Sequence, residues 1–193
     1  MPTQLAPLVG PDTPATPSII RIQKAKVKNQ QLTCELTEQR TDDAPARAFT
    51  LTAQELVHPD LLHRFAQLVP HLCLLTEQLA ETPTYWPEDE AQPLPAHFEP
   101  FTVTGLNIGQ GGGGVTLIGQ RRLVGGKVLN LNSPYVAYDD EAGHAYGYAG
   151  LLETTVRQTL TEVEASLRGK CTEYRQLELF DQPTEPLQLG EGA

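Results

Sequence analysis

The chain has 193 residues, of which 39% are hydrophobic, and a formal charge of −10 at pH 7. This length favours one domain with tails, because single cores are commonly built from about 100–200 residues. There is no run of about 18 apolar residues and no charged start followed by an apolar stretch, which excludes a membrane span and a secretory signal. The three cysteines lack CxxC spacing and predict neither a disulfide framework nor a zinc site. We therefore expect a cytoplasmic protein with no membrane partner.

The acidic residues are concentrated in two segments. Residues 81–99 contain five acids and no Lys or Arg, and residues 173–193 contain five acids and one Arg. Subtracting their charges of −5 and −4 leaves about −1 on the remainder. The folded part is therefore nearly neutral and can carry a basic face despite the acidic total.

Residues 1–18 contain five prolines and no periodicity, which predicts a disordered leader before one domain over 19–172. Apolar residues alternate from Ala25 to Leu36 around a central Lys28–Gln31 turn, a pattern typical of a β-hairpin. A third short strand is predicted at Ala48–Thr52.

From Asp60 to Leu79 the apolar residues recur every three or four positions, which predicts one stripe of a helix. Pro70 lies inside this segment and predicts a kink or two short helices, because proline removes a helical hydrogen bond. The following acidic and proline-rich segment, 82–100, is predicted to be an exposed loop.

Three strands are predicted next, at Phe101–Ile108, Val115–Arg122 and Lys127–Val136, separated by glycine-rich reversals. Helical spacing returns from Tyr148 to Leu167, and Gly169 is the predicted stop.

This order of elements predicts an α+β fold. Strands from about 19–52 and 98–136 would form an antiparallel sheet, and helices at about 60–80 and 146–168 would cover one of its faces. Both halves read as strands followed by a helix, which raises the hypothesis of a duplicated unit, although no residue-level match between the halves is evident.

Several patterns that suggest catalytic or metal chemistry have a plainer interpretation. The glycine run at 109–114 lacks the Lys and Ser or Thr of a phosphate loop and is expected to be a hairpin tip. Three histidines (His58, His63 and His71) have poor spacing for a metal site and are expected to face solvent or cap a helix. The triplet Asp139–Glu141 is expected to charge the start of a helix, with a metal-dependent enzyme as the alternative. With no Ser-His-Asp or Cys-His constellation, we predict neither a catalytic residue nor a cofactor.

Basic residues are better grouped. In a strand, Lys24, Lys26 and Lys28 would project from one face while the apolar residues between them face the core. Three further basic residues flank the Gly125–Gly126 turn: Arg121, Arg122 and Lys127. If the two hairpins are neighbours, these six charges form a stripe that contacts phosphates, and Tyr135 or Tyr138 stacks on bases. The alternative is a lysine-guarded sheet edge that prevents aggregation.

The acidic tail, 173–193, is predicted to be disordered and carries the most specific motif, Gln176-Leu177-Glu178-Leu179-Phe180. It resembles the docking pentapeptide that binds the bacterial sliding clamp, with Gln, Leu, an acidic residue, Leu and Phe in order. In such peptides the Gln hydrogen-bonds at one subsite and the Leu-Phe pair fills an apolar pocket. The resemblance implies the sliding clamp as a partner, and a tail position would leave the motif accessible. The alternative is that these residues form a last strand or fold back onto the domain.

The stretches Gly114–Gln120 and Gly126–Leu131 resemble uncharacterised proteins of Bacteroidetes phages and prophages, over roughly residues 98–170. Together these features predict a non-enzymatic accessory protein of DNA replication, recombination or repair that binds single-stranded DNA and is tethered to the clamp. The alternative is a protein-interaction or virion-associated module that binds no DNA. The sequence predicts no oligomeric state.

Overall fold

The computed structural model describes residues 19–39, 45–79, 94–139 and 146–172. The first half contains strands β1 (Ile19–Lys28), β2 (Gln31–Gln39) and β3 (Arg47–Thr52), then helices α1 (Pro59–Gln67) and α2 (Val69–Leu75). The second half contains β4 (Phe101–Ile108), β5 (Gly114–Arg122), β6 (Val128–Asn132), the two-residue β7 (Val136–Ala137) and α3 (Ala149–Leu167), with short 3-10 turns at Ala96–Phe98 and Gln110–Gly112. The predicted α+β class is confirmed.

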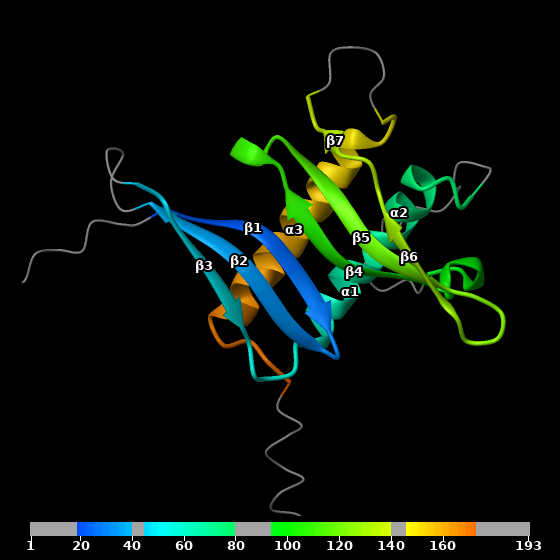
Figure 1. The fold of residues 1–193 in the computed structure, drawn as a ribbon, viewed down its shortest axis with the longest axis horizontal. Helices are drawn as coiled ribbons and strands as arrows, with labels where there is room; N and C mark the ends of the chain where they lie inside the picture. Colours follow the sequence, from blue (N-terminus) through cyan, green and yellow to red (C-terminus); the bar gives the residue numbers. More distant parts are fainter. Residues whose placement is uncertain (1–18, 40–44, 80–93, 140–145, 173–193) are drawn as a thin grey trace, which may run out of the picture.

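The strands form one antiparallel sheet in the order β3-β2-β1-β4-β5-β6, with β7 paired to the start of β5. Figure 1 shows two meanders meeting at β1 and β4, with the helices behind them. The hairpin between β1 and β2 closes through Asn29 and Gln30, both with positive φ, as a tight turn with right-handed strand twist requires.

The two meanders are related by an approximate two-fold axis through the centre of the sheet. Each inner strand carries one bulge, at Gln23 in β1 and at Thr104 in β4, and these residues are 81 positions apart. The same offset aligns four apolar pairs: Ile20 with Phe101, Ile22 with Val103, Ala25 with Leu106, and Val27 with Ile108. The hypothesis of two similar halves therefore has a structural basis that the sequence alone did not reveal.

One face of the sheet is covered by the helices. The side chains buried beneath them alternate along the strands, as a half-buried antiparallel sheet requires; they include Ala25, Leu32, Cys34, Val103, Leu106, Val115 and Leu117. The helices contribute the other wall of the core, chiefly Leu61, Phe65, Leu68, Leu72, Leu152, Val156 and Val163. α1 packs against α3 and against β4, so the helical layer spans the junction between the two meanders.

Some predicted boundaries need correction. The helix predicted to Leu79 breaks at Leu68, one residue before α2 and two before Pro70, and ends at Leu75 because Glu77 adopts a positive φ. The strand predicted through Val136 is interrupted after Asn132, where Pro134 has no N–H to continue the ladder.

Part of the segment 82–100, which was predicted to be an exposed loop, belongs to the core. Its last residues are described, and Phe98 is fully buried there. The predicted leader (1–18) and tail (173–193) lie outside the described residues, as do residues 82–93 of the loop. Within the described segments, no helix combines the length and apolar character needed to cross a membrane.

Candidate nucleic-acid interface

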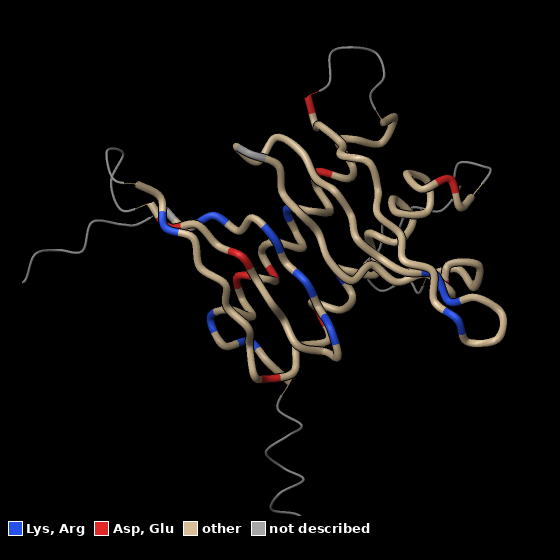
Figure 2. The backbone as a smooth tube through the Cα atoms, in the orientation of Figure 1, with Lys and Arg blue, Asp and Glu red and all other residues tan. Residues whose placement is uncertain are grey.

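The face of the sheet opposite the helices is lined by polar and basic side chains. On β1 the alternation that buries Ala25 turns Lys24, Lys26 and Lys28 to this open face, as predicted. Neighbouring strands add Thr33, Glu35, Asn107, Thr116, Gln120, Asn130 and Asn132 by the same register. In Figure 2 the basic residues of β1 lie in a row along that strand.

The three lysines differ in how much charge they offer a ligand. Lys24 Nζ lies 2.9 Å from Glu35 Oε1 on the adjacent strand, so its charge is largely neutralised by this partner. Lys26 and Lys28 are exposed, and within the described part of the chain no carboxylate forms an ion pair with either. These two ammonium groups are the ones that a phosphate would meet. The Cα atoms of Lys26 and Lys28 are about 6.6 Å apart, which is the rise of two residues along a strand.

β1 and β4 touch over a short seam only. Three residue pairs join them, namely Lys24 with Asn107, Ala25 with Leu106 and Lys26 with Gly105. A bulge lies beside the seam in each strand, and bulges bend a strand and increase its twist. The strands therefore splay apart at both ends of the seam.

A cleft of about 890 Å³ occupies the end of the seam where β1 finishes and β4 begins. Lys26 and Lys28 line one wall. The opposite wall carries three carboxamides, Gln120, Asn130 and Asn132, from β5 and β6. The floor is apolar, with Phe65, Phe98 and Phe101 among its residues. Such a cleft offers cations for phosphates on one side, and on the other carboxamides that can both donate and accept hydrogen bonds.

A second, smaller cleft of about 570 Å³ lies at the other end of the seam, between Arg21 on β1 and the Gly109–Gly112 loop after β4. The approximate two-fold axis relates the two clefts, because each is formed where one inner strand ends and the other begins.

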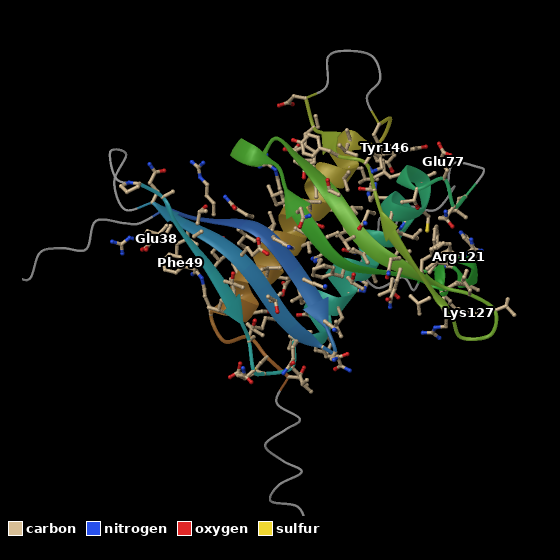
Figure 3. The ribbon with its side chains drawn as sticks, viewed as in Figure 1. Glu38, Phe49, Glu77, Arg121, Lys127 and Tyr146 are labelled. Carbon is tan, nitrogen blue, oxygen red and sulfur yellow. The ribbon has the colours of Figure 1, made fainter. Side chains whose placement is uncertain are left out.

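The second predicted basic group does not assemble as one unit. Arg121 turns to the helix-covered side, where its guanidinium carbon lies 5.2 Å from the Phe101 ring centroid and Nη1 donates to Gln78 Oε1 at 3.0 Å. The next residue, Arg122, is exposed and by alternation faces the open side with Gln120. Lys127 lies in the β5–β6 turn, at the same end of the molecule as Arg121 (Figure 3), and is not among the residues that line the cleft. The structure therefore brings Lys24, Lys26 and Lys28 together and leaves Arg121 out of that group.

The two tyrosines considered for base stacking differ in accessibility. Tyr135 is 54% exposed and packs against Gly109 and Gly114, where an added Cβ would lie 2.5 Å from its hydroxyl oxygen. Tyr138 is half-buried, its hydroxyl is enclosed, and burial raises the pKa of its phenol to about 12. Of these two, Tyr135 is the more accessible ring, and it packs against Gly109, which lines the smaller cleft.

The histidines have separate structural roles. His58 precedes α1 and its Nδ1 accepts from the Asp60 backbone N–H at 3.3 Å, which is the predicted capping role. His63 pairs with Gln67. His71, contrary to the expectation of solvent exposure, is fully buried, lies 3.0 Å from the Tyr146 hydroxyl, and has its pKa lowered to about 3 by burial.

The remaining candidates are the acidic triplet, the cysteines and the glycine run. No group of three His, Cys, Asp or Glu side chains there is placed to hold a metal ion, although Asp140 and Glu141 lie outside it. Burial raises the pKa of the Cys34 and Cys73 thiols to about 12, which disfavours the reactive thiolate. The glycine run forms a short turn between β4 and β5, with strand rather than helix following it.

Sequence reasoning missed the carboxamide wall and the seam. Gln120, Asn130 and Asn132 alternate with buried residues, which was a usable signal for one face, but no sequence pattern indicated that this face would adjoin Lys26 and Lys28. The seam depends on the bulges, whose signal is the three-residue step between apolar positions in both inner strands.

The predicted clamp-docking residues, Gln176, Leu177, Glu178, Leu179 and Phe180, lie outside the described residues. The last described residue, Thr172, is tied to the domain by hydrogen bonds from its backbone N–H to Leu56 O and from its hydroxyl to Val57 O. Neither a model of a known protein family, nor a curated protein, nor a solved structure matches this chain.

Proposed function

We propose that the open face of the sheet binds single-stranded DNA along the β1–β4 seam. The observation that carries the proposal is the cleft with three carboxamides on one wall and, on the other, Lys26 and Lys28, which form no ion pair with any described residue. Lysines neutralise phosphates irrespective of sequence, and side-chain amides pair with the edges of unstacked bases. A single strand suits the site because its bases are free to enter the cleft, whereas a duplex keeps them stacked.

The proposal extends to the tail. The pentapeptide Gln176–Phe180 would dock on the bacterial sliding clamp and hold the domain close to DNA, which makes a weak domain–DNA contact effective by raising its local concentration. The chain would then be a non-enzymatic accessory protein of replication, recombination or repair, encoded by a phage or mobile element.

DNA binding is tested by fluorescence anisotropy with a labelled oligonucleotide of mixed sequence. The Lys26→Gln and Lys28→Gln double variant is expected to weaken binding, while a control double variant, Arg157→Gln with Arg168→Gln, is not. The control likewise removes two positive charges from exposed positions, Arg157 on α3 and Arg168 at its C-terminal cap, on the opposite side of the sheet. Equal weakening by both pairs would show that binding follows net charge alone and would remove the cleft from the proposal.

Clamp docking is tested separately, with purified clamp and the full chain in an equilibrium binding assay. Phe180→Ala is expected to abolish binding, and Leu187→Ala, a change of the same kind outside the pentapeptide, is expected to leave it intact. Binding that survives Phe180→Ala would refute docking through this motif.

A second candidate function, a protein-interaction or virion-associated module without DNA binding, is favoured by a different observation. The outer strand β3 exposes Phe49 and Leu51, which is unusual for a sheet edge, and no other described strand pairs with this edge. An oligonucleotide that fails to bind at low salt would favour this candidate.

A further inference from the structure

The outer edge of β3 is an unprotected sheet edge. All six residues of the strand are exposed, and none of the described residues forms a strand on its outer side. Phe49 is 47% exposed and Leu51 is 42% exposed, and both project on the same face, two residues apart (Figure 3 labels Phe49 at this edge). The strand contains no proline, no lysine and no bulge, the devices that usually prevent another strand from pairing with an edge.

The pairing of β3 with β2 determines which backbone groups of β3 point outward. The N–H of Ala53 donates to Leu32 O, and in an antiparallel ladder the residues that bond to one neighbour alternate. Residues 47, 49, 51 and 53 therefore bond to β2. The N–H and C=O groups of Ala48, Thr50 and Thr52 point outward, away from the sheet.

This pattern is self-complementary about Thr50. We propose that the chain forms a two-fold homodimer in which β3 pairs with β3 of a second copy, antiparallel, with Thr50 on the axis. Thr50 then exchanges both backbone hydrogen bonds with its counterpart, and Ala48 does so with Thr52 of the second copy. That gives about six new backbone hydrogen bonds, two for each facing pair.

The same register brings the exposed apolar side chains together. Phe49 of each copy lies opposite Leu51 of the other in the non-hydrogen-bonded positions, where cross-strand side chains approach most closely. The one charged residue of the strand, Arg47, lies opposite Ala53 of the second copy, so like charges do not meet. An isologous dimer requires each residue to match its counterpart across the axis, and this register sets apolar side chains against apolar ones and keeps the two Arg47 charges apart.

The opposite edge of the sheet lacks these properties. On β6 the exposed apolar residues are Val128 (53%) and Leu129 (42%), which are adjacent and therefore project on opposite faces. The next residue on the face of Leu129 is Leu131, which is already buried in the domain's own core. Pairing two β6 strands would thus bury little additional apolar surface.

The dimer does not depend on the proposed DNA binding, but it has a consequence for it. Because the axis is perpendicular to the sheet, the helices of both copies lie on one side and both open faces lie on the other. A continuous sheet results, with the clefts of both copies accessible from the same side.

Sedimentation equilibrium of the full chain tests the dimer, and two variants test the edge. Thr50→Pro removes an outward N–H that β2 does not use, so the fold is expected to survive while dimer dissociation becomes at least about tenfold easier. Leu51→Glu is expected to act similarly, whereas Leu129→Glu, at a residue of equal exposure on β6, is expected to leave the dissociation constant unchanged. Circular dichroism confirms folding of each variant. A wild-type chain that remains monomeric at about 100 μM, roughly 100 times a micromolar dissociation constant, would overturn the proposal. Dissociation of the dimer by Leu129→Glu alone would also overturn it.

Disulfide cross-linking tests the register. In a Cys171→Ser background, Thr50→Cys is expected to give a covalent dimer under mild oxidation, because paired Cα atoms lie about 5.5 Å apart. Cys34 and Cys73 are buried and cannot contribute. Thr52→Cys is the control on the same strand and face, since its two copies would lie about 13 Å apart. Cross-linking through Thr52→Cys in place of Thr50→Cys would refute the axis.

Discussion

The salt dependence of the proposed DNA binding offers the sharpest test of Lys24, Lys26 and Lys28, because the structure separates Lys24, which has a carboxylate partner, from the other two. Lys26 and Lys28 have no carboxylate partner among the described residues, whereas Lys24 lies 2.9 Å from Glu35. For single strands, each phosphate neutralised by a cation adds about 0.7 to the slope of log affinity against log salt. Removing Lys26 and Lys28 together should therefore lower the slope by about 1.4.

A slope change of this size is readily measured. Between 50 and 200 mM salt, a difference of about 1.4 in slope corresponds to a roughly sevenfold difference in how much the affinity falls. Anisotropy titrations at four or five salt concentrations give the slope for the wild type, for the Lys26→Gln and Lys28→Gln double variant, and for the α3 control described above. The control slope is expected to match the wild type.

Lys24 and Glu35 supply the internal check. Lys24→Gln is expected to change the slope little, because Glu35 already offsets that charge. Glu35→Gln frees Lys24 to contact a phosphate and is expected to raise the slope by about 0.7 and to tighten binding. If Glu35→Gln leaves the slope unchanged while Lys26→Gln with Lys28→Gln lowers it, the phosphates do not reach the centre of the seam. If neither changes it, the reasoning about this face is refuted.

Two predictions concern the core. Gly119→Ala is expected to lower the free energy of unfolding by about 1–3 kcal/mol, because the added Cβ would lie 2.3 Å from Leu72 Cδ2. The control Gly113→Ala, where an added Cβ meets nothing within 4 Å, should change this free energy by less than about 0.5 kcal/mol. Urea denaturation measures both. His71 is neutral in the fold, with its pKa lowered from 6.5 to about 3, so its contribution is fully present above pH 6.5 and is lost as pH falls toward 3. Between pH 7 and 5.5 the wild type should therefore lose about 1 kcal/mol more stability than the His71→Gln variant. Glutamine keeps a group that can form a hydrogen bond with the Tyr146 hydroxyl. Equal losses of stability in the two proteins would contradict a buried neutral ring.

The spacing of hydrophobic residues along the sequence was sufficient to predict most helices and strands of the fold. The alternation around the β1–β2 turn and the three- or four-residue spacing before Leu75 are local signals, and local signals set element type. The break in the first helix was predicted from Pro70, and the end of α3 from Gly169, which has φ +104°. The end of α2 was missed because nothing in the residue type of Glu77 indicates a left-handed backbone.

The candidate site was harder to predict because it depends on which strands become neighbours. Lys26 and Lys28 were identified by alternation within β1 alone. The carboxamide wall lies on β5 and β6, and its distance from those lysines is set by the strand order and by the splay at the seam. Arg121 was grouped with Arg122 by sequence proximity, although strand alternation places adjacent residues on opposite faces and the Phe101 and Gln78 contacts hold Arg121 on the helix side.

The internal two-fold axis explains why the sheet opens where it does. If β1 and β4 were regular strands without the bulges at Gln23 and Thr104, Ile22 and Ala25, which are three positions apart, would project on opposite faces, and so would Val103 and Leu106. Each bulge therefore returns two apolar residues to the helix-covered face and, by the same geometry, bends its strand away from the partner across the seam. As a result, only three residue pairs join β1 to β4. The helical layer of α1 and α3 behind this junction stabilises the two halves against separation. The clefts are thus a consequence of how each half completes its own core, and the lysines and carboxamides of the larger one are the features on which the proposal of DNA binding rests.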